Sequence, residues 1–184
     1  MKHKLITRQL IFILFALLIS ACTEDDPTEP TDENTLLYTS FEKNGVFSAD
    51  GWKLPAQYES STDVPAGGGN FSLVMSASNP PDTAYIKVPV KTQYNKFKLT
   101  FWAYSTGVTN GIYGEAILSL VRNGSVIDSS SILVDGINWK SYSIQDTFSV
   151  ASGDSFMVQL TAGVSPGFFP GKTYFDLCRL YGID

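Results

Sequence analysis

The side chains best suited to chemistry alternate with apolar residues in the segment 97–105. Successive side chains of a β-strand point to opposite faces, so Thr100, Trp102 and Tyr104 share one face and the apolar residues between them share the other. The apolar face predicts the core, and the aromatic face therefore points outward. A pyranose packs its C–H face on an aromatic ring and binds polar neighbours through its hydroxyls, so this row predicts a sugar-binding surface. The alternative is that a neighbouring loop covers Trp102 and makes it part of the core.

Two more outward residues are candidates for the same surface. Gln159 alternates with apolar residues in the segment 155–163, and we expect it beside Trp102 on one sheet face. Tyr85, with its outward neighbour Lys87, has less support as a member of that face. A trough lined by these residues would favour a sugar ligand, whereas a flat or covered face would favour a protein partner.

A second candidate contact is the loop 165–171, in which Phe168 and Phe169 stand between proline and glycine residues. Two adjacent phenylalanines in such a loop cannot both face the core easily. At least one is therefore expected at the rim, where an exposed aromatic ring suits a ligand or a protein contact. The alternative is that one ring closes the end of the fold.

The N-terminus has the features of a targeting signal. Residues 1–8 carry three cations and no acid, and the apolar run at 11–19 is too short to cross a bilayer, which takes about 20 residues. The run ends in LISAC (residues 18–22), which resembles the lipobox of bacterial lipoproteins. The resemblance implies a signal peptide at 1–21 and an acylated Cys22 that anchors the chain to a membrane.

The segment after Cys22 predicts a tether. Residues 23–34 hold six of the 18 acids, two prolines and no aliphatic residue, so we expect them to be extended and disordered. Acids directly after the cysteine resemble the surface-export signal of Bacteroidetes lipoproteins, which implies an outer-membrane anchor and exposure at the cell surface. Residues 35–184 then form one domain of ordinary size. Its ten Lys and Arg nearly balance its twelve Asp and Glu, so nucleic acid is not an expected partner.

Catalytic constellations are hard to build from this composition. The one histidine, His3, lies in the expected signal peptide, which excludes Ser-His-Asp and Cys-His sites and His-ligated zinc from the domain. Cys178 has no disulfide partner if Cys22 is acylated, and its apolar surroundings predict a buried, inert thiol. Glycoside hydrolysis needs two carboxylates, and Glu115 is the one acid that begins a predicted strand with an outward side chain. We therefore expect no enzyme activity; a carboxylate pair assembled from distant loops is the alternative.

Short alternating or β-branched segments recur along residues 35–184, separated by turn signals. Asn123-Gly124 between two such segments is a strong hairpin signal. No segment shows a sustained helical period, so the pattern predicts an all-β fold, a β-sandwich of two antiparallel sheets. Trp52 and Trp139 begin strands beside turns and are interpreted as structural. The predicted strands are 36–41, 71–77, 83–90, 97–105, 115–121, 126–134, 139–150, 155–163 and 173–181.

Several motifs follow one another along the domain: SFE (40–42) with Gly45, GW (51–52), VPAGGGNFSL (64–73), FKLTFWA (97–103), Trp139 and Tyr142 before Phe148, and YFDL (174–177). In order and spacing, they resemble carbohydrate-binding modules of the galactose-binding-like jelly-roll type. The resemblance covers residues 35–184 and implies a jelly roll that binds a glycan. It also implies a structural calcium ion held by an acid near the first strand, Glu42, and an acid near the last strand, Asp176, with backbone carbonyls. The second of the paired acids often found near that last strand is Leu177 here. The alternative partner for the Asp176 charge is Lys43 or Arg179.

Three functions follow, in order of support. The first is a non-catalytic surface lipoprotein that captures a polysaccharide or glycan for a partner transporter or enzyme. The second is a structural or adhesion lipoprotein whose sheet face docks a protein. The third is a glycoside hydrolase or polysaccharide lyase, which would require two carboxylates roughly 5–10 Å apart across a cleft.

Overall fold

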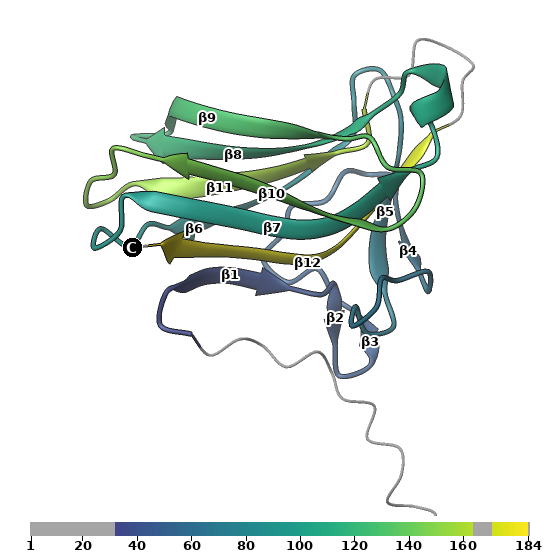
Figure 1. Cartoon of the computed structure of the whole chain (residues 1–184), viewed down its shortest axis with the longest axis horizontal. Coiled ribbons are helices and arrows are strands. Elements are labelled where there is room, and N and C mark those ends of the chain that lie inside the picture. Colours follow the sequence, from purple (N-terminus) through teal and green to yellow (C-terminus); the bar gives the residue numbers. More distant parts are fainter. Residues whose placement is uncertain (1–31, 164–170, 184) are drawn as a thin grey trace, which may run out of the picture.

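The computed structural model describes residues 32–163 and 171–183. This part of the chain is built from β-strands, with one 3-10 turn at Val108–Asn110, and none of its helices is long and apolar enough to span a bilayer. Figure 1 shows the strands in two stacked layers. In chain order they are β1 (Thr35–Thr39), β2 (Glu42–Lys43), β3 (Val46–Phe47), β4 (Tyr58–Ser61), β5 (Ser72–Ser76), β6 (Thr83–Pro89), β7 (Lys96–Ser105), β8 (Gly114–Arg122), β9 (Ser125–Val134), β10 (Lys140–Thr147), β11 (Ser155–Thr161) and β12 (Lys172–Ile183).

The strands form two antiparallel sheets and a small hairpin of β2 and β3. The six-stranded sheet has the order β10-β7-β12-β5-β4, with β1 paired to β12. The four-stranded sheet has the order β6-β11-β8-β9. In Figure 1, β10, β7, β12 and β1 form one layer, and β9, β8, β11 and β6 form the other. The predicted two-sheet antiparallel β-sandwich is therefore confirmed.

The core lies between the sheets and uses the faces that alternation predicts. Phe97 of β7 and Phe156 of β11 meet edge to face with ring centroids 4.6 Å apart, which joins the two layers. Burying one such side chain fully contributes roughly 1.5–3 kcal/mol. The fully buried members of the two predicted faces are Phe97, Leu99, Phe101 and Ala103 on β7, and Phe156, Val158 and Leu160 on β11 with Ala162 directly after it.

The predicted hairpin at Asn123-Gly124 joins β8 to β9. Asn123 and Gly124 both have positive φ angles, 51° and 82°, as a two-residue turn matched to the strand twist requires. Arg122 pairs with Ser125 across this turn. The turn therefore fixes the first pairs of the hairpin, and a one-residue register shift between Leu120 and Val121 then sets the pairing of Glu115 with Leu133.

Sheet membership overturns one expectation about the predicted site. Thr100, Trp102 and Tyr104 lie on β7 of the six-stranded sheet, whereas Gln159 lies on β11 of the four-stranded sheet, paired with Tyr85 of β6. The outward faces of packed sheets point in opposite directions, so the prediction that Gln159 and Tyr85 share a face with Trp102 is wrong. Alternation identifies the outward side chains of a strand, but it does not say to which sheet the strand belongs.

Candidate ligand-binding surfaces

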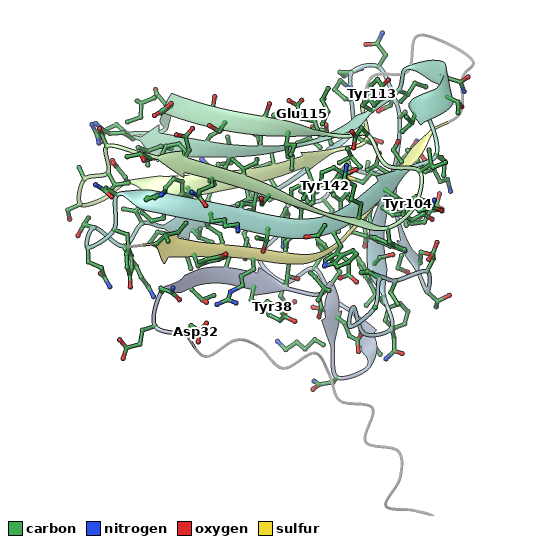
Figure 2. The ribbon with its side chains drawn as sticks, viewed as in Figure 1. Asp32, Tyr38, Tyr104, Tyr113, Glu115 and Tyr142 are labelled. Atoms are coloured by element: carbon green, nitrogen blue, oxygen red, sulfur yellow. The ribbon has the colours of Figure 1, made fainter. Side chains whose placement is uncertain are left out.

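A groove lies on the outer face of the four-stranded sheet, toward the end where Thr83, Glu115 and Thr161 lie. Its cavity volume is about 460 Å³. Figure 2 shows Tyr113 and Glu115 close together at one end of the sandwich. The lining residues that carry its chemistry are Tyr113, Glu115, Ile117, Leu133, Gln159 and Thr161.

Strand register brings these side chains together. Glu115 on β8 pairs with Leu133 on β9 and with Thr161 on β11, and Gln159 pairs with Ile117. Because partners in antiparallel strands point to the same face, all five project outward. They form a surface of mixed apolar and hydrogen-bonding groups.

Tyr113 adds an aromatic ring that is 37% exposed, just before β8 begins. A side chain at Gly163 would collide with the backbone carbonyl of Tyr113, so this glycine allows the two segments to approach. The Tyr85 ring lies on the same sheet face, and the Lys53 ammonium sits 5.6 Å from its centroid. Among the described residues that line the groove, Glu115 is the one carboxylate.

A second surface lies on the outer face of the six-stranded sheet. Tyr104 near the end of β7 stacks on Tyr174 near the start of β12, with centroids 4.3 Å apart and planes 10° apart. Trp139, just before β10, stands at 73° to Tyr104 with a centroid distance of 5.0 Å. We call Tyr104, Trp139 and Tyr174 the aromatic cluster.

Asp63, in the loop between β4 and β5, joins this cluster. Its Oδ2 accepts a hydrogen bond from the Tyr104 hydroxyl at 2.6 Å, and its Oδ1 accepts one from Trp139 Nε1 at 2.9 Å. Burial raises the pKa of Tyr104 well above its ordinary value, and the bond to Asp63 raises it further, so the hydroxyl remains a donor. A pocket of about 400 Å³ opens here, lined by Asp63, Tyr104, Ile137, Asn138 and Trp139. We call it the Asp63 pocket.

The acids Glu42 and Asp176 form a third feature. Asp176 is fully buried; its Oδ1 accepts a hydrogen bond from the Leu177 amide, and its Oδ2 has no hydrogen-bond partner among the described residues. Glu42 accepts hydrogen bonds from the backbone and side-chain amides of Asn70. Burial raises the pKa of Asp176 to about 8, the Leu177 amide lowers it, and the nearby charge of Glu42 raises it again.

Neither alternative cation neutralises Asp176. Lys43 pairs with Asp50 at 2.8 Å, and Arg179 pairs with Asp32 at 2.6 Å. The described residues hold no cluster of three or more acidic, cysteine or histidine side chains, so backbone oxygens would have to complete a metal site. A buried carboxylate oxygen without a partner, beside a second carboxylate, fits a hard cation such as calcium.

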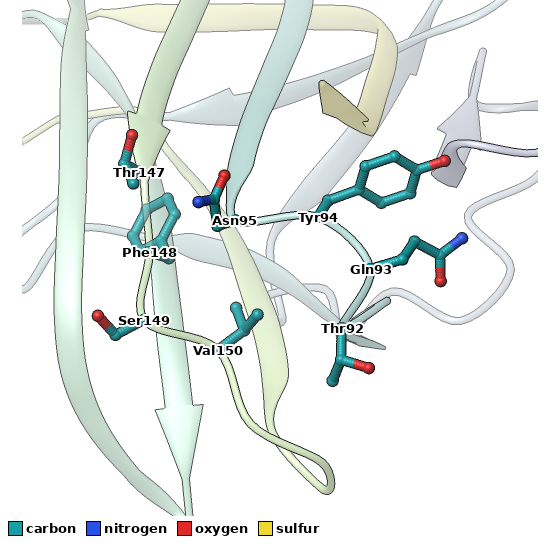
Figure 3. A pocket seen from close by; sticks show the side chains of 8 residues that line it. All are labelled: Thr92, Gln93, Tyr94, Asn95, Thr147, Phe148, Ser149 and Val150. Atoms are coloured by element: carbon teal, nitrogen blue, oxygen red, sulfur yellow. The ribbon is translucent and has the colours of Figure 1, made fainter. Parts of the chain in front are cut away.

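A third cavity, of about 430 Å³, lies between the loops 92–95 and 147–150. Figure 3 shows that the Tyr94 and Gln93 side chains point away from Phe148 and Ser149. The Tyr94 ring packs edge-on to Phe97 with centroids 6.5 Å apart, and a side chain at Gly182 would collide with it. Because this ring is used in packing, the cavity offers hydroxyl and amide groups without a free aromatic platform.

Sequence comparison finds no match, either to a family model or to a curated protein. Solved structures do match. A family 61 carbohydrate-binding module in complex with β-1,4-galactotriose aligns with a TM-score of 0.51 at 16% identity, over 83% of this chain and 100% of that one. The CBM22-1 xylan-binding domain of Paenibacillus barcinonensis Xyn10C aligns with a TM-score of 0.54 at 12% identity, over 82% and 96%. The chain has the jelly-roll fold of these modules.

The same fold occurs inside larger proteins. The enzymatically active domain of tailspike protein 4 from bacteriophage CBA120 aligns with a TM-score of 0.57 at 16% identity, over 73% of this chain. This chain covers 20% of that protein's length. At such identities, the matches establish the fold and leave the ligand to the side chains of this particular jelly roll.

The jelly roll places the predicted residues as follows. Tyr104 lies in the aromatic cluster, Gln159 lies in the groove, and Trp102 is half-buried beside Asp176 in the strand register. Thr100 pairs with Arg179, away from both surfaces. Phe168 and Phe169 lie outside the described residues.

Sequence reasoning missed Tyr113, Tyr174 and the contact role of Trp139, which was interpreted as structural. Tyr174 had a usable signal, because it lies two residues before Asp176 and alternates with the buried Phe175. Asp63 had none, since its position depends on how a loop folds back onto the sheet.

Proposed function

We propose that this jelly roll binds a polysaccharide or glycan without chemical conversion, through the groove on the four-stranded sheet. The observation that carries the proposal is the groove itself, in which Tyr113 stands beside Glu115 and Gln159. A tyrosine ring provides a platform for a sugar, and a carboxylate and an amide bind hydroxyls as acceptors and donors. Glycoside hydrolysis needs a second carboxylate across the cleft, and the described lining residues offer Glu115 alone. Glycan-binding modules of the same fold support the proposal.

A polysaccharide and glycan screen tests this function. The chain from Thr23 onward contains every described residue, and it should bind at least one neutral glycan. Tyr113→Ala and Gln159→Ala should each weaken that binding tenfold or more, which corresponds to about 1.4 kcal/mol. Tyr58→Ala removes a 45% exposed tyrosine on β4, away from the groove, and should leave the affinity unchanged. Binding that survives the groove variants would contradict the proposal.

Protein docking is the second candidate. Edge strand β9 exposes Val126, Ile127 and Leu133, which are 52%, 48% and 53% accessible. An apolar edge strand is a surface to which another protein can add a strand or a helix. Failure of every glycan to bind, with the fold intact by circular dichroism, would favour this candidate.

We also propose that the chain is a lipoprotein of the outer membrane, anchored through Cys22 and exposed at the cell surface. The support is the lipobox-like segment 18–22 and the acidic segment after it. Cys22→Ser should release the protein from the membrane fraction and remove the acyl mass from the mature N-terminus. Surface exposure would show as cleavage by protease added to whole cells.

A structural calcium ion at Glu42 and Asp176 is a separate proposal. The ion would neutralise a buried carboxylate and join the start of the sandwich to its last strand. Calcium should raise the melting temperature, and magnesium should do so less, because Mg²⁺ retains its water more strongly. Asp176→Asn should abolish the calcium response, while Asp50→Asn, at an exposed acid paired with Lys43, should retain it.

A further inference from the structure

The Asp63 pocket contains a carboxylate that forms no ion pair with any cation of the described residues. The lysines next to the aromatic cluster have other partners. Lys140, which follows Trp139, pairs with Asp135 at 3.1 Å, and Lys172, on the strand of Tyr174, pairs with Glu59 at 2.7 Å. Two cations near the pocket, Lys140 and Lys172, are thus paired with other acids, and the Asp63 charge is left for a ligand.

Two neutral donors hold this carboxylate in place. Each oxygen of Asp63 accepts one hydrogen bond, from the Tyr104 hydroxyl or the Trp139 indole, and a carboxylate oxygen has a further lone pair to offer. Neutral donors orient the group without cancelling its charge. Asp63 itself is exposed, so a ligand can reach it.

The aromatic rings supply the second half of a cation site. The face of a tyrosine or tryptophan ring attracts a cation, and this attraction adds to that of a carboxylate. Trp139 stands at 73° to Tyr104 and at 79° to Tyr174, so the rings meet as two walls rather than as one flat stack. The Ile137 side chain at the rim is 61% exposed and adds an apolar contact for alkyl groups.

We propose that Asp63, Tyr104 and Trp139 form a binding site for an organic ammonium group, separate from the groove on the other sheet. An alkylated amine places its carbon substituents against the rings and Ile137, and its charge against the Asp63 carboxylate. A sugar that bears a free amine offers the same combination. A uronic or sialic acid is excluded, because its carboxylate would face that of Asp63.

Nuclear magnetic resonance of the indole N–H groups tests the proposal directly. The Trp139 indole donates to Asp63, so its signal reports on the pocket; Trp139→Phe identifies that signal among the three tryptophans. The ¹⁵N-labelled chain from Thr23 onward is titrated with choline and with glucosamine. The neutral analogues of matched shape are 3,3-dimethyl-1-butanol and N-acetylglucosamine.

Three variants separate the effect of the Asp63 charge on binding from an effect on the fold of the pocket. Asp63→Asn removes the charge but also one acceptor of the cluster. Ile137→Lys changes an exposed side chain at the pocket rim and supplies an internal ammonium that competes for Asp63. Ile137→Gln, of similar length and no charge, is its control.

Saturable movement of the Trp139 signal by choline or glucosamine, with little response to the neutral analogues, is expected. Asp63→Asn and Ile137→Lys should each weaken binding at least tenfold, and Ile137→Gln, which removes the apolar contact but adds no charge, should weaken it less than Ile137→Lys does. The tighter of the two cations then identifies the source of the ammonium group. Equal response to the neutral analogues, unchanged affinity in Ile137→Lys, or no response to either cation would overturn the proposal. The Trp139 signal reports on the Asp63 pocket and not on the groove, so failure of this proposal and failure of glycan binding are distinguishable.

Discussion

Asp154 and Asp176 are both buried acids, yet their surroundings act on them in opposite directions. The Arg122 guanidinium donates to both oxygens of Asp154, at 2.9 and 2.7 Å, and the Ala151 amide donates at 2.8 Å. Asp176 has one donor and an acidic neighbour. The hydrogen bond from Arg122 lowers the pKa of Asp154 despite its burial, whereas burial raises the pKa of Asp176. Asp154 thus forms an ion pair with Arg122, whereas Asp176 is a candidate metal ligand.

This difference predicts a pH dependence for the Arg122–Asp154 pair. The folded-state pKa of Asp154 is lower than its ordinary value of 3.8, so the folded protein favours the ionised carboxylate. The pair therefore contributes stability above about pH 4, and this contribution is lost as the pH falls through the folded-state pKa. Asp154→Asn should lower the urea midpoint at pH 7, and its difference from wild type should shrink below about pH 4. A constant difference down to pH 2 would contradict this assignment.

The close packing of Gly68 against Asp176 predicts a loss of stability on substitution. A side chain here would collide with Asp176 Oδ2 and with the Pro65 ring, so the loop 65–70 can cover the acid only with glycine at this position. Gly68→Ala should lower the free energy of unfolding by about 1–3 kcal/mol, as overpacking does, and should weaken the calcium response. Ala66→Ser in the same loop should change stability by less than about 0.5 kcal/mol. Calorimetry with and without calcium measures both effects, and an unaltered Gly68→Ala protein would refute the close approach.

At the scale of the strands, the β8–β9 turn depends on backbone conformation more than on packing. Gly124 has a φ of 82°, and a side chain there would meet no atom within 4 Å. Gly124→Ala should therefore cost about 1–2 kcal/mol from the left-handed conformation alone. Asn123→Gly, at the other positive φ, should change stability by less than about 1 kcal/mol. Urea unfolding measures both, and a Gly124→Ala protein as stable as wild type would show that the turn adopts another type.

The strands also show which information the sequence contains. Alternation and turn residues predict the long strands, their core faces and the Asn123-Gly124 hairpin, because these depend on neighbours along the chain. The short strands β2, β3 and β4 were not predicted, since they hold two to four residues and little alternation. The sheet partner of β11 depends on long-range pairing, and this is why Gln159 was placed on the wrong face. Tyr113 and Asp63 were missed because both lie outside the strands, where the alternating pattern does not say which way a side chain points.

In the whole molecule, the N-terminal end of the described residues lies away from both candidate ligand surfaces. Asn34 exchanges hydrogen bonds with the Gly182 backbone, at 3.0 and 3.1 Å, whereas the aromatic cluster uses Tyr174 at the start of the same strand. Eight residues of β-strand span roughly 26 Å at about 3.3 Å per residue. Figure 2 shows Asp32 at the opposite end of the sandwich from Tyr104. A chain tethered through residues 23–34 would thus present the groove and the Asp63 pocket away from the membrane.

The two surfaces belong to different sheets, and this separation predicts that they bind independently. The groove residues project from β8, β9 and β11, whereas the Asp63 pocket lies over β7 and β10, with the buried core between them. Substitutions at sites without shared contacts usually have additive effects, so Tyr113→Ala should leave ammonium binding unchanged and Asp63→Asn should leave glycan binding unchanged. Isothermal titration of a glycan with and without saturating choline measures the coupling directly, and the two dissociation constants should agree within about twofold. Competition between them would mean that one ligand spans both faces or that the core transmits a change from one sheet to the other. Independent binding would make the jelly roll a bivalent module, able to hold a neutral glycan on one face and a cationic group on the other.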